Sequence, residues 1–259
     1  MSNNVSSRLQ NQDLVRLAQQ NYEKQQRVKI PPVVITLPSK GLIYPESSPL
    51  RSGKVEMRHM TAYDEDILSN SNYLKTGVVF DKLLESLIVT PGVHVDDISP
   101  VDREGLLISA RIYGYGKMYP VLLTDPATNN TIEREIDLSK LNFKTFTLQP
   151  DENGEFEYRT STDDVLKFRF LTFALTKNID PERAVSDLML ASIQQVNENR
   201  DKNYISEYLK FEMLALDAKN FRNYLAEHIP GIDFSVEVEG EDGGTFTAMF
   251  QIGSDLFWF

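Results

Sequence analysis

The chain has 259 residues, of which 41% are hydrophobic and none is cysteine, and its formal net charge is −11. A chain of this length buries roughly 70–75% of its unfolded surface, and the missing cysteines exclude disulfides, thiolate metal ligands and cysteine nucleophiles. Residues 1–30 carry a net charge of +3, so the remainder carries −14 and repels phosphate backbones, which argues against nucleic acid as the main partner.

Residues 1–30 are a weakly basic arm, rich in Gln and Asn. Its apolar residues recur at helical spacing: Leu14, Leu17, Ala18 and Tyr22. This stripe is too thin to bury a full helical face. We expect an amphipathic helix that frays alone and is ordered by a partner, and Pro31-Pro32 ends it. A solvated segment is favoured over a hook for nucleic acid or membrane. The polar start predicts no signal peptide, and no stretch reaches the roughly 18 apolar residues of a membrane span.

Two strand patterns follow the arm. A short apolar run from residue 33 meets Pro38 and a turn that ends at Gly41, and a second apolar run follows that turn. Residues 54–60 then alternate between apolar and charged side chains, which indicates a half-buried strand.

Three helices are predicted next. Thr61 begins a loose capping box and opens a short helix. Residues 76–90 place their large apolar side chains on one helical face, and Pro91-Gly92 stops that helix. Ser99 followed by Pro100 is a strong start for the third helix, because Ser caps well and Pro suits the first helical position.

Residues 117–148 return to strand patterns. Two alternating runs are separated by turns at Asp125-Pro126 and Asn129-Asn130, and a hairpin-like turn lies at 152–154. The clearest half-buried strand spans residues 166–170.

A helical block follows, beginning at Asp180-Pro181. The first predicted helix has one face made of Val185, Leu188, Met189, Ser192 and Val196. The second is expected to carry Tyr204, Tyr208, Phe211 and Ala215, and the third to end near His228. Two strands, 234–238 and 245–251, close the pattern around a Gly-rich turn.

These patterns predict an α+β protein with a mostly antiparallel sheet, a C-terminal helical block and extended N- and C-terminal segments. The expected parts are the arm (1–30), an α+β region (31–160), a region of strand, helices and terminal strands (161–252) and an aromatic tail (253–259). Regions 31–160 and 161–252 can equally belong to one globular unit.

Residues that could support catalysis are sparse. The three histidines, His59, His94 and His228, are far apart and lack the spacing of metal ligands. The tightest acidic groups, Asp64-Glu65-Asp66 and Asp96-Asp97, fit helix capping and dipole roles better than an acid–base pair. We therefore predict no catalytic residue, cofactor, metal or small-molecule substrate.

The end of the chain is unusual, because four bulky apolar residues stand together: Leu256, Phe257, Trp258 and Phe259. Exposed, they would be an aggregation hazard. Two readings stay open: the tail packs into the protein's own core, or it docks in a pocket of a neighbouring subunit, where aromatic side chains serve as anchors.

Two segments of the first half, taken in order, carry a resemblance. Residues 35–45 read ITLPSKGLIYP and residues 53–70 read GKVEMRHMTAYDEDILSN, and further on stand Asp102-Arg103 and Leu106-Leu107. This order resembles the baseplate hub subunits of T4-like contractile-tailed phages over roughly residues 33–145. Related phage proteins often carry a CxxC pair where this chain has Asp125 to Asn130, so any metal role is expected to be lost here.

The resemblance implies a structural or chaperone role in assembling a baseplate hub, in the host cytoplasm during assembly, with the virion tail baseplate as an open option. The implied partners are other hub or tail proteins, with a homo-oligomer as a further option. The predicted contact residues are Leu37, Pro38, Lys40, Gly41 and Tyr44, together with Leu256, Phe257, Trp258 and Phe259. The Pro-stiffened segment 37–44 would lose little entropy on docking, although it could equally pack on its own sheet. The alternative function is a baseplate cell-wall hydrolase that uses paired carboxylates.

Overall fold

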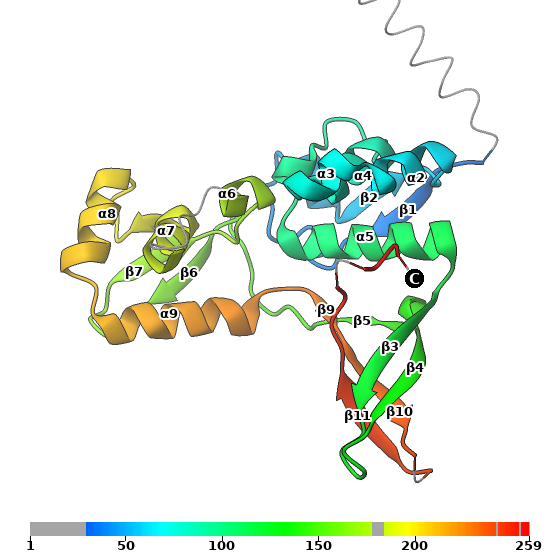
Figure 1. The fold of residues 1–259 in the computed structure, drawn as a ribbon. Helices are drawn as coiled ribbons and strands as arrows, with labels where there is room; N and C mark the ends of the chain where they lie inside the picture. The colour runs from blue at the N-terminus through cyan, green and yellow to red at the C-terminus, as the bar shows by residue number, and fades with distance from the viewer. Residues whose placement is uncertain (1–29, 178–183, 242, 254, 259) are drawn as a thin grey trace, which may run out of the picture.

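The computed structural model describes residues 30–177, 184–241, 243–253 and 255–258 (Figure 1). The predicted arm therefore lies outside the described residues, apart from Ile30, and so do Asp180-Pro181 and Phe259. The described chain forms a layer of helices over a small sheet, a pair of long hairpins beside it, and a mixed part built from three strands and four helices. The predicted α+β class, with antiparallel pairing, is confirmed.

The first part begins with β1 (Val33–Thr36) and β2 (Lys54–Met57), which pair antiparallel with Val33 opposite Met57. The 3-10 turn η1 (Pro49–Ser52) lies between them, and η2 (Val95–Asp97) lies further along. Its helices are α2 (Ala62–Ser69), α3 (Ser71–Thr76), α4 (Val79–Leu87) and α5 (Pro100–Tyr115). The predicted starts are confirmed: Thr61 and Asp64 form the capping box of α2, and the Ser99 side chain caps α5.

Two antiparallel hairpins extend away from α5 (Figure 1). One consists of β3 (Met118–Thr124) and β4 (Thr131–Asp137), and the other of β10 (Ser235–Glu239) and β11 (Thr245–Met249). The short strands β5 (Asn142–Phe143) and β9 (Ile232–Asp233) pair near their base, after the turn η3 (Leu138–Lys140).

The tip of the first hairpin is held by the Asp and Asn chemistry expected there. Asp125 Oδ1 accepts from the Ala127 backbone N–H at 2.8 Å, while Asp125 Oδ2 accepts from the Glu241 backbone N–H, also at 2.8 Å. The Asn130 side chain donates to Glu241 at 2.8 Å. The turn thus joins the two hairpins through hydrogen bonds.

The mixed part contains the sheet β6 (Phe156–Arg159), β7 (Val165–Phe168) and β8 (Ile193–Val196) in that order. Helices α6 (Phe173–Lys177), α7 (Ala184–Ser192), α8 (Lys202–Phe211) and α9 (Ala215–His228) complete it. Its core is aromatic: the Phe168 ring lies 5.6 Å from Phe156 and 5.4 Å from Phe221, centroid to centroid. The boundary expected after residue 160 falls inside this sheet, between β6 and β7.

Two helix predictions in this part are wrong in detail. Val196 was expected on a helical face, but the helix ends at Ser192 and residues 193–196 form β8, where Val196 pairs with Leu166. Strand pairing with β7 overrides the helical spacing, because it buries Ile193 and Val196 completely. Ala215 was expected in the second helix, but α8 ends at Phe211 and Ala215 begins α9.

Within the described ranges, no helix is long and apolar enough to span a membrane.

Candidate functional site

The segment 37–44 is locked to the start of α5 by one buried carboxylate. Asp102 is fully buried and accepts hydrogen bonds from the Ser39 backbone N–H at 2.8 Å and the Ser39 hydroxyl at 2.7 Å. The Tyr44 hydroxyl donates to Asp102 at 2.6 Å and accepts from the Ser99 backbone N–H at 3.0 Å. The Ser99 hydroxyl also donates to Asp102, at 3.1 Å. Two of the stretches that carried the resemblance, residues 35–45 and the start of α5, therefore meet at Asp102.

This network sets the pKa of its members. Burial raises the pKa of the Asp102 carboxyl, although the donors from Ser39, Tyr44 and Ser99 oppose that shift. Burial, followed by the nearby charge of Asp102, raises the pKa of the Tyr44 hydroxyl well above its ordinary value. Each carboxylate oxygen has a donor, so the carboxylate acts as a structural acceptor that fixes the segment to the helix.

Backbone geometry fixes the turn within the same segment. Lys40 and Gly41 both have positive φ, 52° and 79°. A Cβ on Gly41 would collide with the Arg51 carbonyl and lie 2.6 Å from the Gly53 backbone nitrogen. On the other side, Pro38 packs so closely on α5 that a Cβ on Gly105 would lie 2.6 Å from its ring. The turn is thus wedged between η1 and α5.

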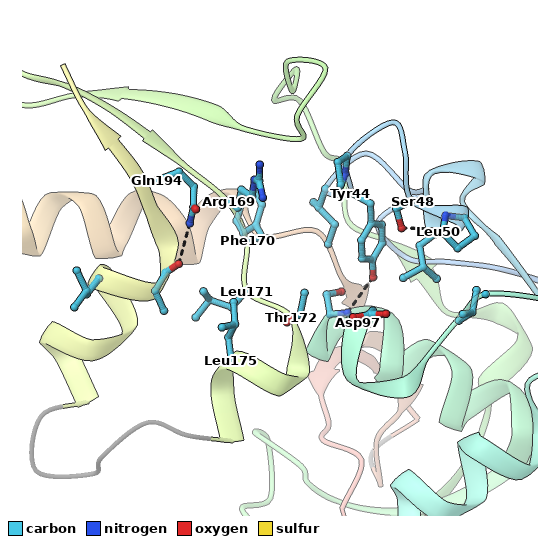
Figure 2. A pocket seen from close by; sticks show the side chains of 18 of the residues that line it. Tyr44, Ser48, Leu50, Asp97, Arg169, Phe170, Leu171, Thr172, Leu175 and Gln194 are labelled. Atoms are coloured by element: carbon cyan, nitrogen blue, oxygen red, sulfur yellow. Dashed lines mark hydrogen bonds between the residues drawn. The ribbon is translucent and has the colours of Figure 1, made fainter. Parts of the chain in front are cut away.

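A cleft of about 660 Å³ lies between this segment and the mixed part (Figure 2). One wall comes from Tyr44, Ser48 and Leu50, with Asp97 below them. The other wall comes from the chain after β7 and from α6, α7 and β8. Its lining residues there include Phe170, Leu171, Thr172, Leu175, Leu190 and Gln194. The lining is mainly apolar, as in protein sites that receive apolar side chains or ligands.

Charged residues lie at the margin of the cleft. Glu155, which is buried, accepts from Arg169 at 2.9 Å and from Arg200 at 2.8 Å. Burial alone would raise the pKa of Glu155, but Arg200 and Arg169 outweigh it and the pKa is lowered. Burial lowers the pKa of Lys202, whose ammonium donates to the Ile193 carbonyl at 2.7 Å. Arg169 and Lys202 line the cleft together with Asp97 and Asp187, so its charged lining carries both signs.

The predicted contact residues of segment 37–44 are mostly inside the protein. Leu37, Pro38, Gly41 and Tyr44 are buried by the protein's own atoms, and Lys40 is exposed. Of the two options for this segment, packing on its own elements is the one that the structure shows for these four residues. Contact of the segment with a partner stays a prediction, and Lys40 is its accessible member.

The aromatic tail also packs on its own chain. Leu256 and Phe257 are buried, and the Phe257 ring lies 5.8 Å from Phe80 of α4 and 6.3 Å from Tyr115 of α5. Trp258 lies 6.0 Å from Phe80 and remains 38% exposed. Residues 255–257 of the tail form a turn and not a strand. Phe259 lies outside the described residues, and docking of the tail on a neighbour stays a prediction.

The predicted acidic cluster has a structural use. Asp64 is buried and forms a two-point ion pair with Arg58, at 2.7 and 2.8 Å. The Thr61 backbone N–H and the Ser86 hydroxyl donate to it at 2.8 and 2.9 Å. Burial alone would raise its pKa, but these donors outweigh burial and the pKa is lowered. Asp64 is therefore ionised, and Glu65 and Asp66 beside it are exposed.

The three histidines lie apart from one another, and each has its own surroundings. His59 meets the Tyr113 ring edge-on at 5.9 Å, His228 stacks on Tyr224 at 4.1 Å, and His94 precedes η2. In the described parts of the chain, no group of three or more His, Cys, Asp or Glu residues is arranged to hold a metal ion.

The ion pair of Asp64 gives a pH prediction. A carboxyl with a lowered pKa in the folded state stabilises the fold above its unfolded pKa, and this contribution is lost as pH falls through the folded value. Wild type should thus lose stability below about pH 4, while Asp64→Asn should already be less stable at pH 7 and show a flatter loss over that range. Urea unfolding between pH 7 and pH 3 measures both. Equal acid slopes would contradict the assignment, and Asp66→Asn is the matched exposed control.

The sequence did not identify the cleft. Its walls come from residues 43–50, 92–99, 169–175 and 187–202, which share no local motif. Only the apolar pattern of 166–170 hinted at one wall, because it predicted a strand that ends at the cleft.

These observations describe an α+β protein with an apolar cleft between two of its parts and a buried carboxylate that ties its first segment to a helix. A family model described as the T4 bacteriophage base plate protein matches residues 34–257. The chain belongs to this family of phage base plate proteins, a setting that implies contacts with other tail proteins. Comparison with curated proteins and with solved structures gave no match.

Proposed function

We propose that this base plate protein is a structural or chaperone-like component of baseplate hub assembly, which acts through contacts with other hub or tail proteins in the host cytoplasm. The observation that carries the proposal is the family match over residues 34–257, a range that includes segment 37–44, the cleft and most of the tail. The hub, as the particular part of the baseplate, is supported by the order of the sequence segments in the first half of the chain, which resembles that of hub subunits.

Several surface features support a role in protein contacts. The cleft is large enough for several apolar side chains, and Leu175 on its wall is 45% exposed. Among the described members of the predicted contact set, Trp258 and Lys40 reach the surface. The buried members, such as Tyr44 and Phe257, hold them in place.

The hydrolase alternative requires one carboxyl with a raised pKa beside an ionised one. The predicted cluster does not supply this pair, because the pKa of Asp64 is lowered and the carboxylate is bound to Arg58. We therefore carry the alternative only as an outcome of the test below.

The test is co-expression with the neighbouring tail proteins, purification through a tag on this chain, and native mass determination of the complex. We expect a complex of defined mass that contains a hub protein. Capture of other tail proteins without any hub protein would remove the hub from the proposal. Cleavage of purified peptidoglycan by the protein would favour the hydrolase instead.

Trp258 provides a residue-level prediction for the same complex. Because aromatic anchors at the centre of an interface commonly contribute 2 kcal/mol or more, Trp258→Ala should weaken the association about tenfold or more. Its melting temperature should change little, because the ring is partly exposed. Leu122→Ala on β3, where the side chain is 73% exposed, is the matched control and should bind as wild type. Full binding by the Trp258 variant would mean that the tail serves packing alone.

A further inference from the structure

Strand β1 has a free edge. In the β1–β2 ladder Val34 lies opposite Glu56, and the backbone of Glu56 bonds away from β1: its carbonyl accepts from Val89 N–H at 2.9 Å and its N–H donates to Thr90 Oγ1 at 2.6 Å. Val34 and Glu56 are therefore a pair without mutual hydrogen bonds, and the N–H and C=O of Val34 point to the other side of β1. Thr36, two residues further along, is likewise paired with Lys54 without mutual hydrogen bonds, so its N–H and C=O also point to the free side of β1. No described strand pairs with β1 on that side.

A groove runs along this free edge. Its volume is about 270 Å³, and β1 contributes Val34, Ile35 and Thr36 to its lining while β2 contributes none. Its other walls are α5, the chain around η3 and β5, and Ile232 of β9, and the lining residues there include Ile108, Ile112, Tyr113 and Phe143. All of these residues are uncharged. The groove therefore offers main-chain hydrogen-bonding groups on one side and apolar side chains on the others.

The edge lacks the usual protection against strand addition. Proteins block free edges with charged residues, Pro or bulges, but Val33–Thr36 contains none of these. The surface around it is apolar: Val34 is 55% exposed, Tyr113 50% and Phe143 37%. Pro31-Pro32 and Pro38 flank the strand, so they limit any added strand to a window of a few residues.

We propose that the groove beside β1 receives an extended segment of a partner protein, which adds as a third strand next to Val34 and Thr36 and places alternate apolar side chains over Ile108 and Ile112. This proposal rests on the proposed function, since it names the kind of contact that an assembly protein would make there. Main-chain hydrogen bonds supply the affinity, and the apolar groove selects a segment with apolar residues at every second position.

Two other occupants fit less well. Residues 1–29 join the structure beside β1, but their apolar residues have helical spacing and Pro31-Pro32 separates them from the strand. A second copy could pair β1 with β1, but two four-residue strands bury far less than the roughly 1,200 Å² of a stable interface. A partner strand can continue past β1 into the groove and bury more.

The test uses hydrogen–deuterium exchange on the full chain, free and in the complex purified with co-expressed tail proteins. The amides of Val34 and Thr36 should exchange quickly in the free protein and at least tenfold more slowly in the complex. Val34→Pro removes the edge donor without removing a bond to β2, so it should weaken the complex at least tenfold. Val34→Thr keeps the donor and is the matched control, with binding as wild type.

Four other results of this experiment would overturn the proposal. A complex with a hub or tail protein in which both amides stay unprotected would overturn the strand proposal and leave the proposed function standing. Absence of any complex would overturn both. Protection in the free chain that disappears when residues 1–29 are removed would assign the groove to the arm, and protection that depends on protein concentration would assign it to a second copy. Either result would replace the partner strand.

Discussion

Asp102→Ala should lower the free energy of unfolding by about 3 kcal/mol or more, because several buried donors lose their acceptor at once. The carboxylate is fully buried and accepts from Ser39, Tyr44 and Ser99. Its removal leaves these donors without acceptors in the protein interior, and each such group costs about 1–3 kcal/mol. Urea unfolding at pH 7, followed by circular dichroism, measures the difference.

Two controls separate this network from general damage. Tyr44→Phe removes one hydroxyl from the network and should cost about 1–2 kcal/mol. Asp97→Ala changes an exposed carboxylate at the cleft wall and should stay within about 0.5 kcal/mol of wild type. If Asp102→Ala were no more destabilising than Asp97→Ala, the joint between segment 37–44 and α5 would have to be held by the packing of Pro38 on Gly105 instead.

Gly41→Ala should lower the free energy of unfolding by about 3 kcal/mol or more. This is more than the unfavourable backbone conformation alone would cost, and the difference reports the steric clash at this turn. A residue other than Gly at positive φ costs about 1–2 kcal/mol by itself. At Gly41 the added methyl would also collide with the Arg51 carbonyl and the Gly53 nitrogen, which are backbone atoms and cannot turn aside. The turn must then open and lose its fit between η1 and α5.

Gly77→Ala is the matched control for this prediction. Gly77 has nearly the same φ, 72° against 79°, but a Cβ there meets nothing within 4 Å. We expect a loss of about 1 kcal/mol at Gly77. Similar losses at the two positions, measured by urea unfolding, would show that backbone conformation alone accounts for Gly41 and that the close approach is relieved by a small shift.

The network and the turn explain what the resembling segments do. Ser39 and Asp102 are 63 positions apart, yet they form two hydrogen bonds. The LPSKG stretch and the start of α5 are therefore a joint of the fold. The partner contact predicted for segment 37–44 is left to the exposed Lys40 and to two surfaces that this joint holds in position, the wall of the cleft and the edge of β1.

The sequence by itself determined the local elements. The capping box at Thr61, the Ser99-Pro100 start of α5 and the alternation of β3 and β4 all depend on residues within a few positions of one another. Backbone preferences and caps act at that range, so these elements were predictable. The α+β class and the family resemblance follow from the same local patterns taken in order.

The tertiary structure decided the remaining features. Val196 was predicted in a helix but lies in β8, because pairing with β7 buries it. Leu256 and Phe257 are buried in the chain's own core, where Phe257 packs on α4 and α5. The cleft and the free edge of β1 depend on residues brought together from distant positions. Periodicity reports which face of an element is apolar, but the element that covers this face is chosen by long-range packing, and no local pattern specifies it.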